Sequence, residues 1–553
     1  MSDVKQQEKQ VCEVFAISLS PEAQAPIDTV SNADDALELP SDFEAAIDAT
    51  GYGLFNFLLL LAILPGGWAC IFDTTTMAYI LPSAECDLKL TLFDKGVLNA
   101  AIFAGMFISA FIWGFLADTN GRRSLLRIGF IADAICNVLC SMSQNFYMMV
   151  FFKFLSGCII NGPYAIKMTY LAEFSGSKHR FQTLLWASLS SASSNIALPV
   201  LAWMIIPQSW SFTLFDGAFV FNSWRIFLLI SSLPAFTAFL TLLYFPESPR
   251  FLMSQGRNDE ALKVFRKMYT MNTGNPPESF PIRDLCQEAQ KRQIERSASR
   301  KSMSAWDKTR SGWAQIKPLF RQPYLGQFLL IITIQFGGIL SLNTLRLWIP
   351  QLFTLIENFD YENRDPNSGM PTLCEMISAP STVSNVTFSD VVNGTVESTC
   401  IASPVPSRVY INSIIIAVTT VMGFTLAGNL VNLIGKKPLL LTVYAVSAFC
   451  CLILNWSPNS DATLAILAIY LAGSSVSVNT IISFIVALMP TSLRTMAVSL
   501  TMCVGRSGAL IGNLLFPILL VAGCMAPFIF VGGFLMACFL LSIFIPKPPA
   551  KLM

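Results

Sequence analysis

Residues 114–123 read GFLADTNGRR and set an aspartate and two arginines between two long apolar runs. A related stretch, GNLVNLIGKK, occupies residues 428–437 and also lies between apolar runs. A charged turn that recurs in this way is typical of a duplicated fold in which two helical bundles move about a central site. The matched positions are Gly114 and Gly428, Asp118 and Asn432, Gly121 and Gly435, Arg122 and Lys436, and Arg123 and Lys437.

The composition places this repeat in a membrane protein. Of the 553 residues, 53% are hydrophobic and 13% are charged, and this charged fraction is about half that of soluble domains. The apolar residues gather in twelve runs, each long enough to cross a hydrocarbon layer of about 30 Å. We therefore expect an all-α membrane protein with twelve transmembrane helices in two six-helix pseudo-repeats. The runs are 54–81, 96–117, 125–143, 147–172, 182–206, 226–246, 325–353, 410–433, 438–457, 462–487, 496–521 and 525–546.

The polar segments between the runs define the domain organisation. The connections rich in Lys and Arg all fall on one side if the spans alternate, and the positive-inside rule assigns that side, with both termini, to the cytosol. The formal net charge of +1 gives no indication of nucleic-acid binding. The expected units are a disordered cytosolic tail at 1–52, an N-terminal bundle at 53–250, a basic cytosolic linker at 251–323, a C-terminal bundle at 324–546 and a cytosolic tail at 547–553.

One large loop, residues 357–409, falls on the luminal or extracellular side. It contains NVT at Asn385 and NGT at Asn393, and both fit the N-glycosylation pattern. It also contains Cys374 and Cys400, which an oxidising compartment would allow to pair. We therefore expect a glycoprotein with a Cys374–Cys400 disulfide in this loop.

The repeated turns are candidate gating elements. Their glycines permit tight turns, their basic residues anchor at the interface, and Asp118 can pair across helices or cap a helix end. Glu173, Arg180 and Arg494 lie in other connections on the same side and extend this expected network. The alternative, a generic charged turn, does not account for the repetition.

These motifs resemble those of the major facilitator superfamily, with Thr119 where that family usually has a basic residue. The further motifs that carry this likeness are KFLSGCIING at 153–162, PESPRFL at 246–252 and MPTSLR at 489–494.

Within that superfamily the chain resembles the synaptic vesicle glycoprotein 2 branch. The stretches are LPSAECDL at 81–88, NSWRIF at 222–227, PESPRFLMSQGRNDEA at 246–261 and GALIGNLLF at 508–516, and Trp203 matches the branch's fifth-span tryptophan. The acidic pair of the branch's first span is reduced to Asp73, with Cys70 at the other place. The tenth span lacks the branch's tryptophan and acidic residues. The resemblance therefore implies the fold and the membrane, while ligand preferences are not carried over.

Ionisable side chains inside apolar spans default to a functional interpretation because they are costly to expose to lipid. The spans contain Asp73, Asp133, Lys153, Lys167, Arg346 and Arg506. In the resembled fold, spans one, four, seven and ten line the central cavity. That rule selects Asp73, Lys167 and Arg346 as substrate or coupling candidates, with Asn161, Tyr164, Trp203 and Asn479 as further candidates.

Three interpretations of these candidates stay open. Asp73 and Lys167 can form a buried pair that stabilises one half. Lys167 or Arg346 can bind an anionic group in the cavity, or Asp73 can bind a coupling proton. Arg346 can alternatively extend its side chain to the luminal interface.

The sequence offers little evidence for an enzyme active site. His179 is the one histidine, no GxxxxGK[ST] loop is present, and we expect no catalytic residue, cofactor or metal site. The first functional hypothesis is a secondary active or facilitative transporter of a small organic solute, an anion being one option, with a proton or other ion as an optional co-substrate. The second is a non-transporting vesicle membrane glycoprotein that acts in trafficking or as a receptor. The expected location is the plasma membrane or a secretory or synaptic-type vesicle.

Overall fold

The structure, a computed structural model, describes residues 42–214, 219–285, 317–359, 371–378 and 405–546. Within them, twelve helices are long and apolar enough to span a membrane. The N-half spans are α3 (Leu54–Ala84), α4 (Leu92–Thr119), α5 (Arg122–Ser141), α6 (Phe146–Ala172), α7 (Arg180–Ile205), and α8 (Ser223–Ser231) continued by α9 (Leu233–Leu242). The C-half spans are α14 (Leu325–Glu357), α17 (Ser407–Ile434), α18 (Lys436–Ile453), α19 (Ser460–Leu488), α20 (Thr491–Ala522) and α21 (Ala526–Ile543).

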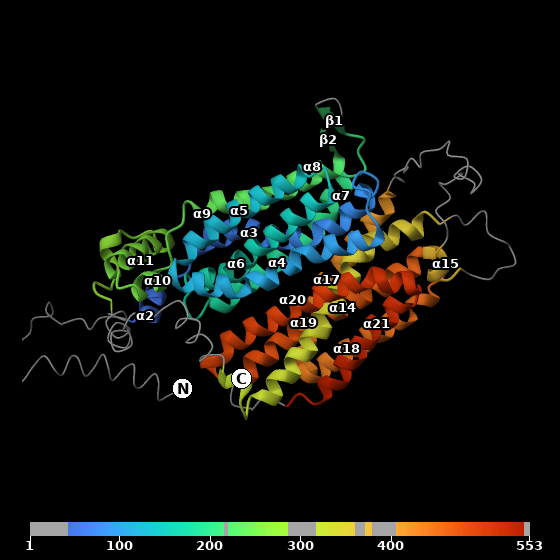
Figure 1. The fold of residues 1–553 in the computed structure, drawn as a ribbon. Helices are drawn as coiled ribbons and strands as arrows, with labels where there is room; N and C mark the ends of the chain where they lie inside the picture. Colours follow the sequence, from blue (N-terminus) through green and yellow to red (C-terminus); the bar gives the residue numbers. More distant parts are fainter. Residues whose placement is uncertain (1–41, 215–218, 286–316, 360–370, 379–404, 547–553) are drawn as a thin grey trace, which may run out of the picture.

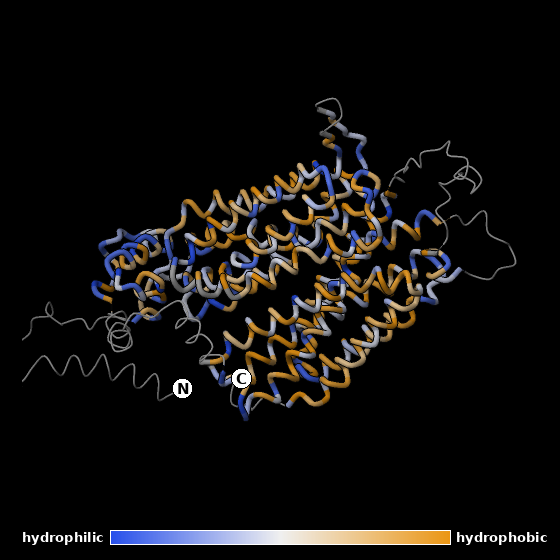
Figure 2. Tube along the Cα trace, in the orientation of Figure 1, coloured by the Kyte–Doolittle hydropathy of each residue, from blue (hydrophilic) through white to orange (hydrophobic). Residues whose placement is uncertain are grey.

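The expected all-α membrane fold of two six-helix bundles is confirmed. Figure 1 shows the N-half and the C-half side by side, and Figure 2 shows hydrophobic residues along the spans and hydrophilic ones toward their ends. The halves meet where α4 packs on α20, α7 on α17 and α3 on α14. At one such crossing a Cβ on Gly96 would lie 2.8 Å from the Asn513 carbonyl oxygen and 2.7 Å from Pro517 Cγ. Only glycine permits the helices to approach so closely there.

Shorter elements distinguish the two ends of the bundle. One end carries α2 (Phe43–Ala49), α10 (Pro249–Ser254) and α11 (Asn258–Thr273), and we name it the α11 end. The opposite end carries the hairpin of β1 (Ser211–Leu214) and β2 (Phe219–Asn222) together with α15 (Leu373–Ser378), and we name it the α15 end. Short 3-10 turns are η1 (Pro277–Ser279), η2 (Lys317–Phe320) and η3 (Leu454–Trp456).

Polar residues at the start of the spans fix where several helices begin. Thr91 and Asp94 form a reciprocal capping box at α4, with the Thr91 hydroxyl donating to Asp94 at 2.7 Å. Asn145 caps α6 and Asn459 caps α19 through their side-chain oxygens. These caps satisfy backbone N–H groups that a helix start otherwise leaves without partners.

The tail expected to be disordered through residue 52 is partly ordered. Residues 42–52 include α2, which buries Phe43, Ala46 and Ile47, and the Phe43 ring lies 6.2 Å from the ring of Phe265 on α11. The expectation was wrong here because these apolar residues recur at helical spacing and so form one buried face. Residues 1–41 lie outside the described part of the chain.

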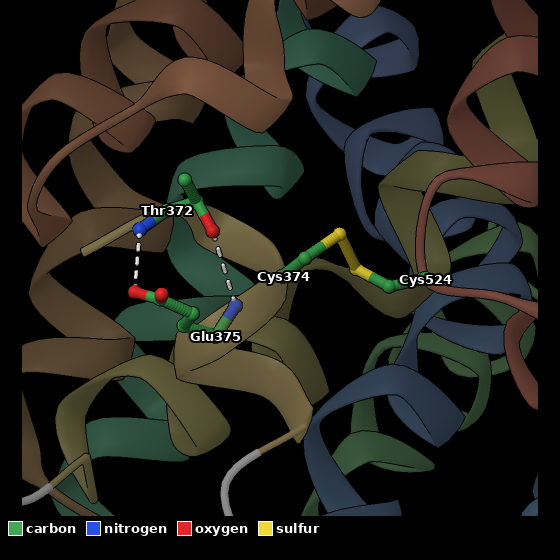
Figure 3. Close-up of a disulfide and its surroundings, with 4 residues drawn as sticks. All are labelled: Thr372, Cys374, Glu375 and Cys524. Atoms are coloured by element: carbon green, nitrogen blue, oxygen red, sulfur yellow. Dashed lines mark hydrogen bonds between the residues drawn. A yellow bond between two sulfur atoms is a disulfide. The ribbon is translucent and has the colours of Figure 1, made fainter.

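The disulfide expected between Cys374 and Cys400 is also corrected. Cys374 on α15 bonds to Cys524, which follows the end of α20 (Figure 3). Thr372 and Glu375 cap α15 reciprocally, with backbone-to-side-chain distances of 3.2 and 3.3 Å. The prediction considered only the large loop and neglected the short turn between α20 and α21, which reaches the same end of the bundle. Cys400, Asn385 and Asn393 lie outside the described residues.

Candidate functional site

A cavity of about 320 Å³ lies between the two halves. Its volume is at the lower end of the range for small-molecule sites. Four helices of the N-half and four of the C-half line it, namely α3, α4, α6, α7, α14, α17, α19 and α20. The lining mixes apolar side chains with hydroxyl and amide groups, and its charged members among the described residues are two arginines, Arg346 and Arg506.

Arg346 on α14 reaches from the C-half to the N-half. Its Nη2 donates to Thr75 Oγ1 at 2.9 Å and to Asn195 Oδ1 at 2.7 Å. Both partners are neutral, and they come from α3 and α7. The alternative in which Arg346 extends to the membrane interface was wrong, because this guanidinium lines the cavity and is held by the opposite half.

Arg506 on α20 makes a second contact across the halves. Its Nη1 donates to Asn161 Oδ1, and its Cζ lies 5.8 Å from the centroid of the Tyr164 ring. Asn161 is buried and donates in turn to the Met106 carbonyl and to Ser109 Oγ. Asn161 therefore holds the guanidinium from outside the cavity lining, whereas Tyr164 is part of that lining.

The two guanidiniums have no ionic partner within the described residues. Neither takes part in an ion pair there, and no Asp or Glu in that part of the chain lines the cavity. A charge held inside a membrane bundle without a counter-charge is energetically costly. The electrostatics of the cavity therefore favour an anionic group over a neutral or cationic one.

Lys167 lies near this cavity but does not line it. Its side chain is buried between α3 and α7, where its neighbours include Leu60, Leu64 and Ser190. Its Nζ lies 5.3 Å from the Tyr164 ring centroid, and it forms no ion pair among the described residues. The predicted pairing of Lys167 with Asp73 is not what the structure contains.

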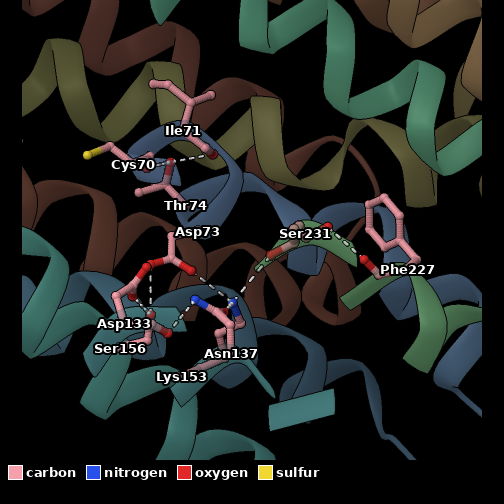
Figure 4. Close-up of polar contacts among 11 residues, drawn as sticks. Cys70, Ile71, Asp73, Thr74, Asp133, Asn137, Lys153, Ser156, Phe227 and Ser231 are labelled. Carbon is pink, nitrogen blue, oxygen red and sulfur yellow. Dashed lines mark hydrogen bonds and ion pairs between the residues drawn. The ribbon is translucent and has the colours of Figure 1, made fainter. Parts of the chain in front are cut away.

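Asp73 pairs with Lys153 instead, inside the N-half bundle (Figure 4). The distance from Lys153 Nζ to Asp73 Oδ1 is 3.5 Å, and both side chains are buried. Lys153 precedes Lys167 on α6 by fourteen residues, or about 21 Å of helix rise. The prediction chose the wrong lysine because it judged depth from span ends and expected a long side chain to bridge the difference.

A second carboxylate completes this charge cluster of Asp73, Asp133, Lys153 and Ser156. Ser156 Oγ lies 2.8 Å from Asp73 Oδ2 and 3.0 Å from Asp133 Oδ1, and Figure 4 shows the two carboxyl groups facing each other. Lys153 also donates to Asn137 Oδ1 at 3.0 Å. The cluster thus holds two carboxyl groups and one ammonium away from water.

The repeated turns adopt matching backbone conformations. Gly121 has φ 84° and ψ 150°, and Gly435 has φ 85° and ψ 165°, in a region that favours glycine. Arg123 Nη2 donates to the Leu243 carbonyl at 2.9 Å. In the second copy Lys437 Nζ donates to the Ile543 and Ile545 carbonyls, each at 2.7 Å. Each turn therefore fixes the end of the last span of its own half.

Carboxylates surround the first turn. The Arg123 backbone N–H donates to Glu247 at 2.9 Å, and Arg122 lies 3.5 Å from Glu173. Burial raises the pKa of Glu173, and the charge of Arg122 opposes that shift. Arg180 instead binds Glu44 of α2, at 2.9 Å.

The remaining predicted gating and site residues are more dispersed. Asn432 and Lys436 are exposed, and Arg494 is half-buried. Gly114 and Asp118 lie within α4, where the structure describes only their backbone. Trp203 on α7 is 42% exposed and lies outside the cavity lining, whereas Asn479 on α19 lines it.

Comparisons with known proteins fit this architecture. A family model described as "Sugar (and other) transporter" matches residues 60–350 and 397–551, which is more than half of the chain. The chain belongs to the sugar (and other) transporter family. Its relatives include human synaptic vesicle glycoprotein 2A, 30% identical over 59% of this chain and 45% of that protein. Rat synaptic vesicle glycoprotein 2B is 28% identical over 60% of this chain and 50% of that protein.

Solved structures support the same fold for this member of the transporter family. The partially occluded, inward-open xylose transporter XylE from E. coli matches with a TM-score of 0.60 and 16% identity, covering 89% of this chain and all of that one. An inward-open structure of the same transporter gives a TM-score of 0.61 at 16% identity, covering 90% of this chain and 98% of that one. The chain is thus an integral multi-pass membrane protein of the major facilitator fold, and it spans about half the length of the curated relatives it matches.

Sequence reasoning missed several residues of this transporter-family site. Arg506 was visible as a charge within an apolar span, but the rule that spans one, four, seven and ten line the cavity excluded it. Asp133 was visible in the same way and was left without a partner. Thr75 and Asn195 carried no signal, because hydroxyl and amide groups are common in such spans.

Proposed function

We propose that this transporter-family chain moves a small organic anion across a membrane by alternating access, with the central cavity as its solute site. The observation that carries the proposal is the pair of arginines, Arg346 and Arg506, which line the cavity without a carboxylate among the described residues. Guanidinium groups bind carboxylate or phosphate oxygens through two parallel hydrogen bonds. A neutral sugar would leave both positive charges without a counter-charge.

The contacts across the halves suggest how binding is linked to movement. Arg346 and Arg506 belong to the C-half, and their hydrogen-bond acceptors, Thr75, Asn195 and Asn161, belong to the N-half. An anion is a stronger acceptor than a neutral amide or hydroxyl, so it competes for these guanidiniums. Solute binding would then weaken polar contacts that join the halves and favour their rearrangement.

The charge cluster around Asp73 is the proposed site of a co-transported proton. A serine hydroxyl has one hydrogen, yet Ser156 Oγ lies within hydrogen-bond distance of both Asp73 and Asp133. If both carboxyl groups were ionised, one of these contacts would place two acceptors together. One proton on the carboxyl pair satisfies both contacts and balances the charge of Lys153.

The orientation of the chain in the membrane is part of the proposal. The α11 end carries Arg122, Arg123, Lys436 and Lys437, which the positive-inside rule assigns to the cytosol. The α15 end would then face the lumen or the exterior, where the Cys374–Cys524 disulfide is stable.

The second candidate is a transporter-shaped glycoprotein that does not transport. The likeness to synaptic vesicle glycoproteins 2A and 2B favours it, because those names describe a vesicle location and no substrate. The two candidates differ in a measurable way, since only a transporter moves solute across a sealed bilayer.

Proteoliposome uptake tests the proposal. The full chain would be reconstituted and offered gluconate, glutarate, D-glucose or choline, with and without an inward acid gradient. Gluconate and glucose are nearly equal in size and differ in charge, so they form the critical pair. We expect uptake of at least one anion above that of empty liposomes, little uptake of glucose or choline, and stimulation by the gradient. Uptake of glucose without either anion would contradict the solute class, and failure to move any probe would favour the second candidate.

A further inference from the structure

We infer that the solute carries two acidic groups, because the site offers two separate anion-binding positions. This inference rests on the proposed function and deepens it. The first position is formed by Arg346 with Thr75 and Asn195, on α14, α3 and α7. The second is formed by Arg506, Tyr164 and Lys167, on α20 and α6.

The second position gathers two cations around one aromatic ring. Lys167 Nζ lies 5.3 Å and Arg506 Cζ lies 5.8 Å from the centroid of Tyr164. The ring offsets part of the repulsion between the two cations through its quadrupole. It supplies no negative charge, and neither cation has an ionic partner among the described residues.

Burial makes the lack of a counter-charge at Lys167 significant. The residue is 3% exposed, between apolar side chains of α3 and serines of α7. Tyr164, by contrast, is 40% exposed and lines the cavity. A carboxylate bound beside this ring would therefore lie near two cations, Arg506 in the cavity lining and Lys167 just outside it.

Charge accounting favours a dianion over a monoanion. A monoanion bound at Arg346 leaves the positive charges of Arg506 and Lys167, both beside Tyr164, without compensation. A dianion supplies one acidic group to each position and leaves a single excess positive charge. The neutral partners in the structure, Asn161 and Asn195, satisfy hydrogen bonds but compensate no charge.

The test compares diacids with their own monoesters. The purified full chain would be titrated with succinate, glutarate and adipate, which bracket the spacing between the acidic groups, and with the monomethyl ester of each. We expect at least one diacid to bind about tenfold more tightly than its ester, because a second charge-assisted contact is worth about that factor. Equal binding of every diacid and its ester would overturn this inference while leaving the proposed anion site intact. No binding of any of these probes would count against the proposed function and the inference together.

Variants of Lys167 locate the second position. Lys167→Gln should reduce the preference for the diacid over its ester about tenfold, whereas Lys167→Arg, which keeps the charge, should retain most of it. Arg408→Gln is the control, because it also removes one positive charge but does so outside the cavity lining. Arg408 is 59% exposed and paired with Glu357 and Asp461. A diacid preference that survives in Lys167→Gln would overturn the assignment of the second position. Lys167→Arg also shows whether loss in the Gln variant reflects charge or misfolding.

Discussion

The two halves share the same arrangement of six spans but differ in where their charged side chains are buried. Every charged side chain that is fully buried within the described residues lies in the N-half, among them Asp73, Asp133 and Lys153. The C-half has no fully buried charge in that part of the chain, and its Arg346 and Arg506 are half-buried where they line the cavity. The enclosed charges Asp73 and Lys153 pair with each other, whereas Lys167 and the two cavity arginines have no ionic partner among the described residues.

The repeated turns show the same asymmetry on a smaller scale. Arg123 and Lys437 both donate to carbonyls at the end of their half's last span. Among the described residues, carboxylates contact the first turn alone, where Glu247 accepts from the Arg123 backbone and Glu173 lies 3.5 Å from Arg122. The two turns therefore share a backbone geometry and a contact with the last span, and they differ in the carboxylates around them.

The largest expected effect is in the enclosed cluster. Lys153→Met leaves Asp73 and Asp133 without their cation, and breaking a buried ion pair from one side costs about 3–5 kcal/mol of unfolding free energy. Arg506→Met, in the cavity, should cost clearly less, because its acceptor, the Asn161 side chain, is a neutral amide. Denaturant unfolding in one detergent compares the two variants. Equal losses of unfolding free energy in the two variants would contradict the proposed difference between enclosed and cavity-facing charges.

The next effect concerns the disulfide, which links α15 to the turn after the end of α20. Cys374 and Cys524 are 150 residues apart in sequence, so their bond closes a long loop. Cys524→Ser should lower the unfolding free energy by about 2–4 kcal/mol. Cys158→Ser, at a free and half-buried cysteine, is the control. Mass spectrometry that finds Cys374 as a free thiol in the folded protein would refute the pairing.

Alanine at the paired turn glycines sharpens the comparison. Gly121→Ala and Gly435→Ala each force a positive φ on a residue with a Cβ, at about 1–2 kcal/mol. Only the first also brings that Cβ to 2.6 Å from Glu247 Oε2, whereas the second meets nothing nearer than 3.9 Å. Thermal unfolding should therefore show a larger loss for Gly121→Ala. A larger loss for Gly435→Ala would contradict the assigned role of Glu247.

The smallest effect is expected where α2 contacts the start of α7, at the α11 end. Arg180 and Glu44 form an ion pair in which both side chains are partly exposed. Glu44→Gln should change the unfolding free energy by less than about 1 kcal/mol, because solvent screens such pairs. A loss of several kcal/mol, measured under the conditions used for Lys153→Met, would show that α2 is integral to the fold.

Much of the architecture could be predicted from the sequence, because lipid imposes long apolar spans and the duplicated turn reveals the repeat. The site could be predicted only in part. Arg346 was identified, but the pairing of Asp73 was not, since the choice between Lys153 and Lys167 depends on helix packing. Arg506 was excluded by a rule about which spans line the cavity. Cys524 was missed because a two-helix turn carries no signal of its proximity to α15.

The most direct test of the anion site compares glutarate, gluconate and D-glucose uptake by proteoliposomes that contain the wild-type chain, Arg346→Gln, Arg506→Gln or the exposed control Arg408→Gln. The account predicts that the wild type and Arg408→Gln take up at least one of the two anions in preference to glucose. Each cavity variant should lose at least about tenfold of that uptake, as expected for one charge-assisted contact. Anion uptake that persists at the wild-type rate in both cavity variants would contradict the claim that these two arginines bind the solute.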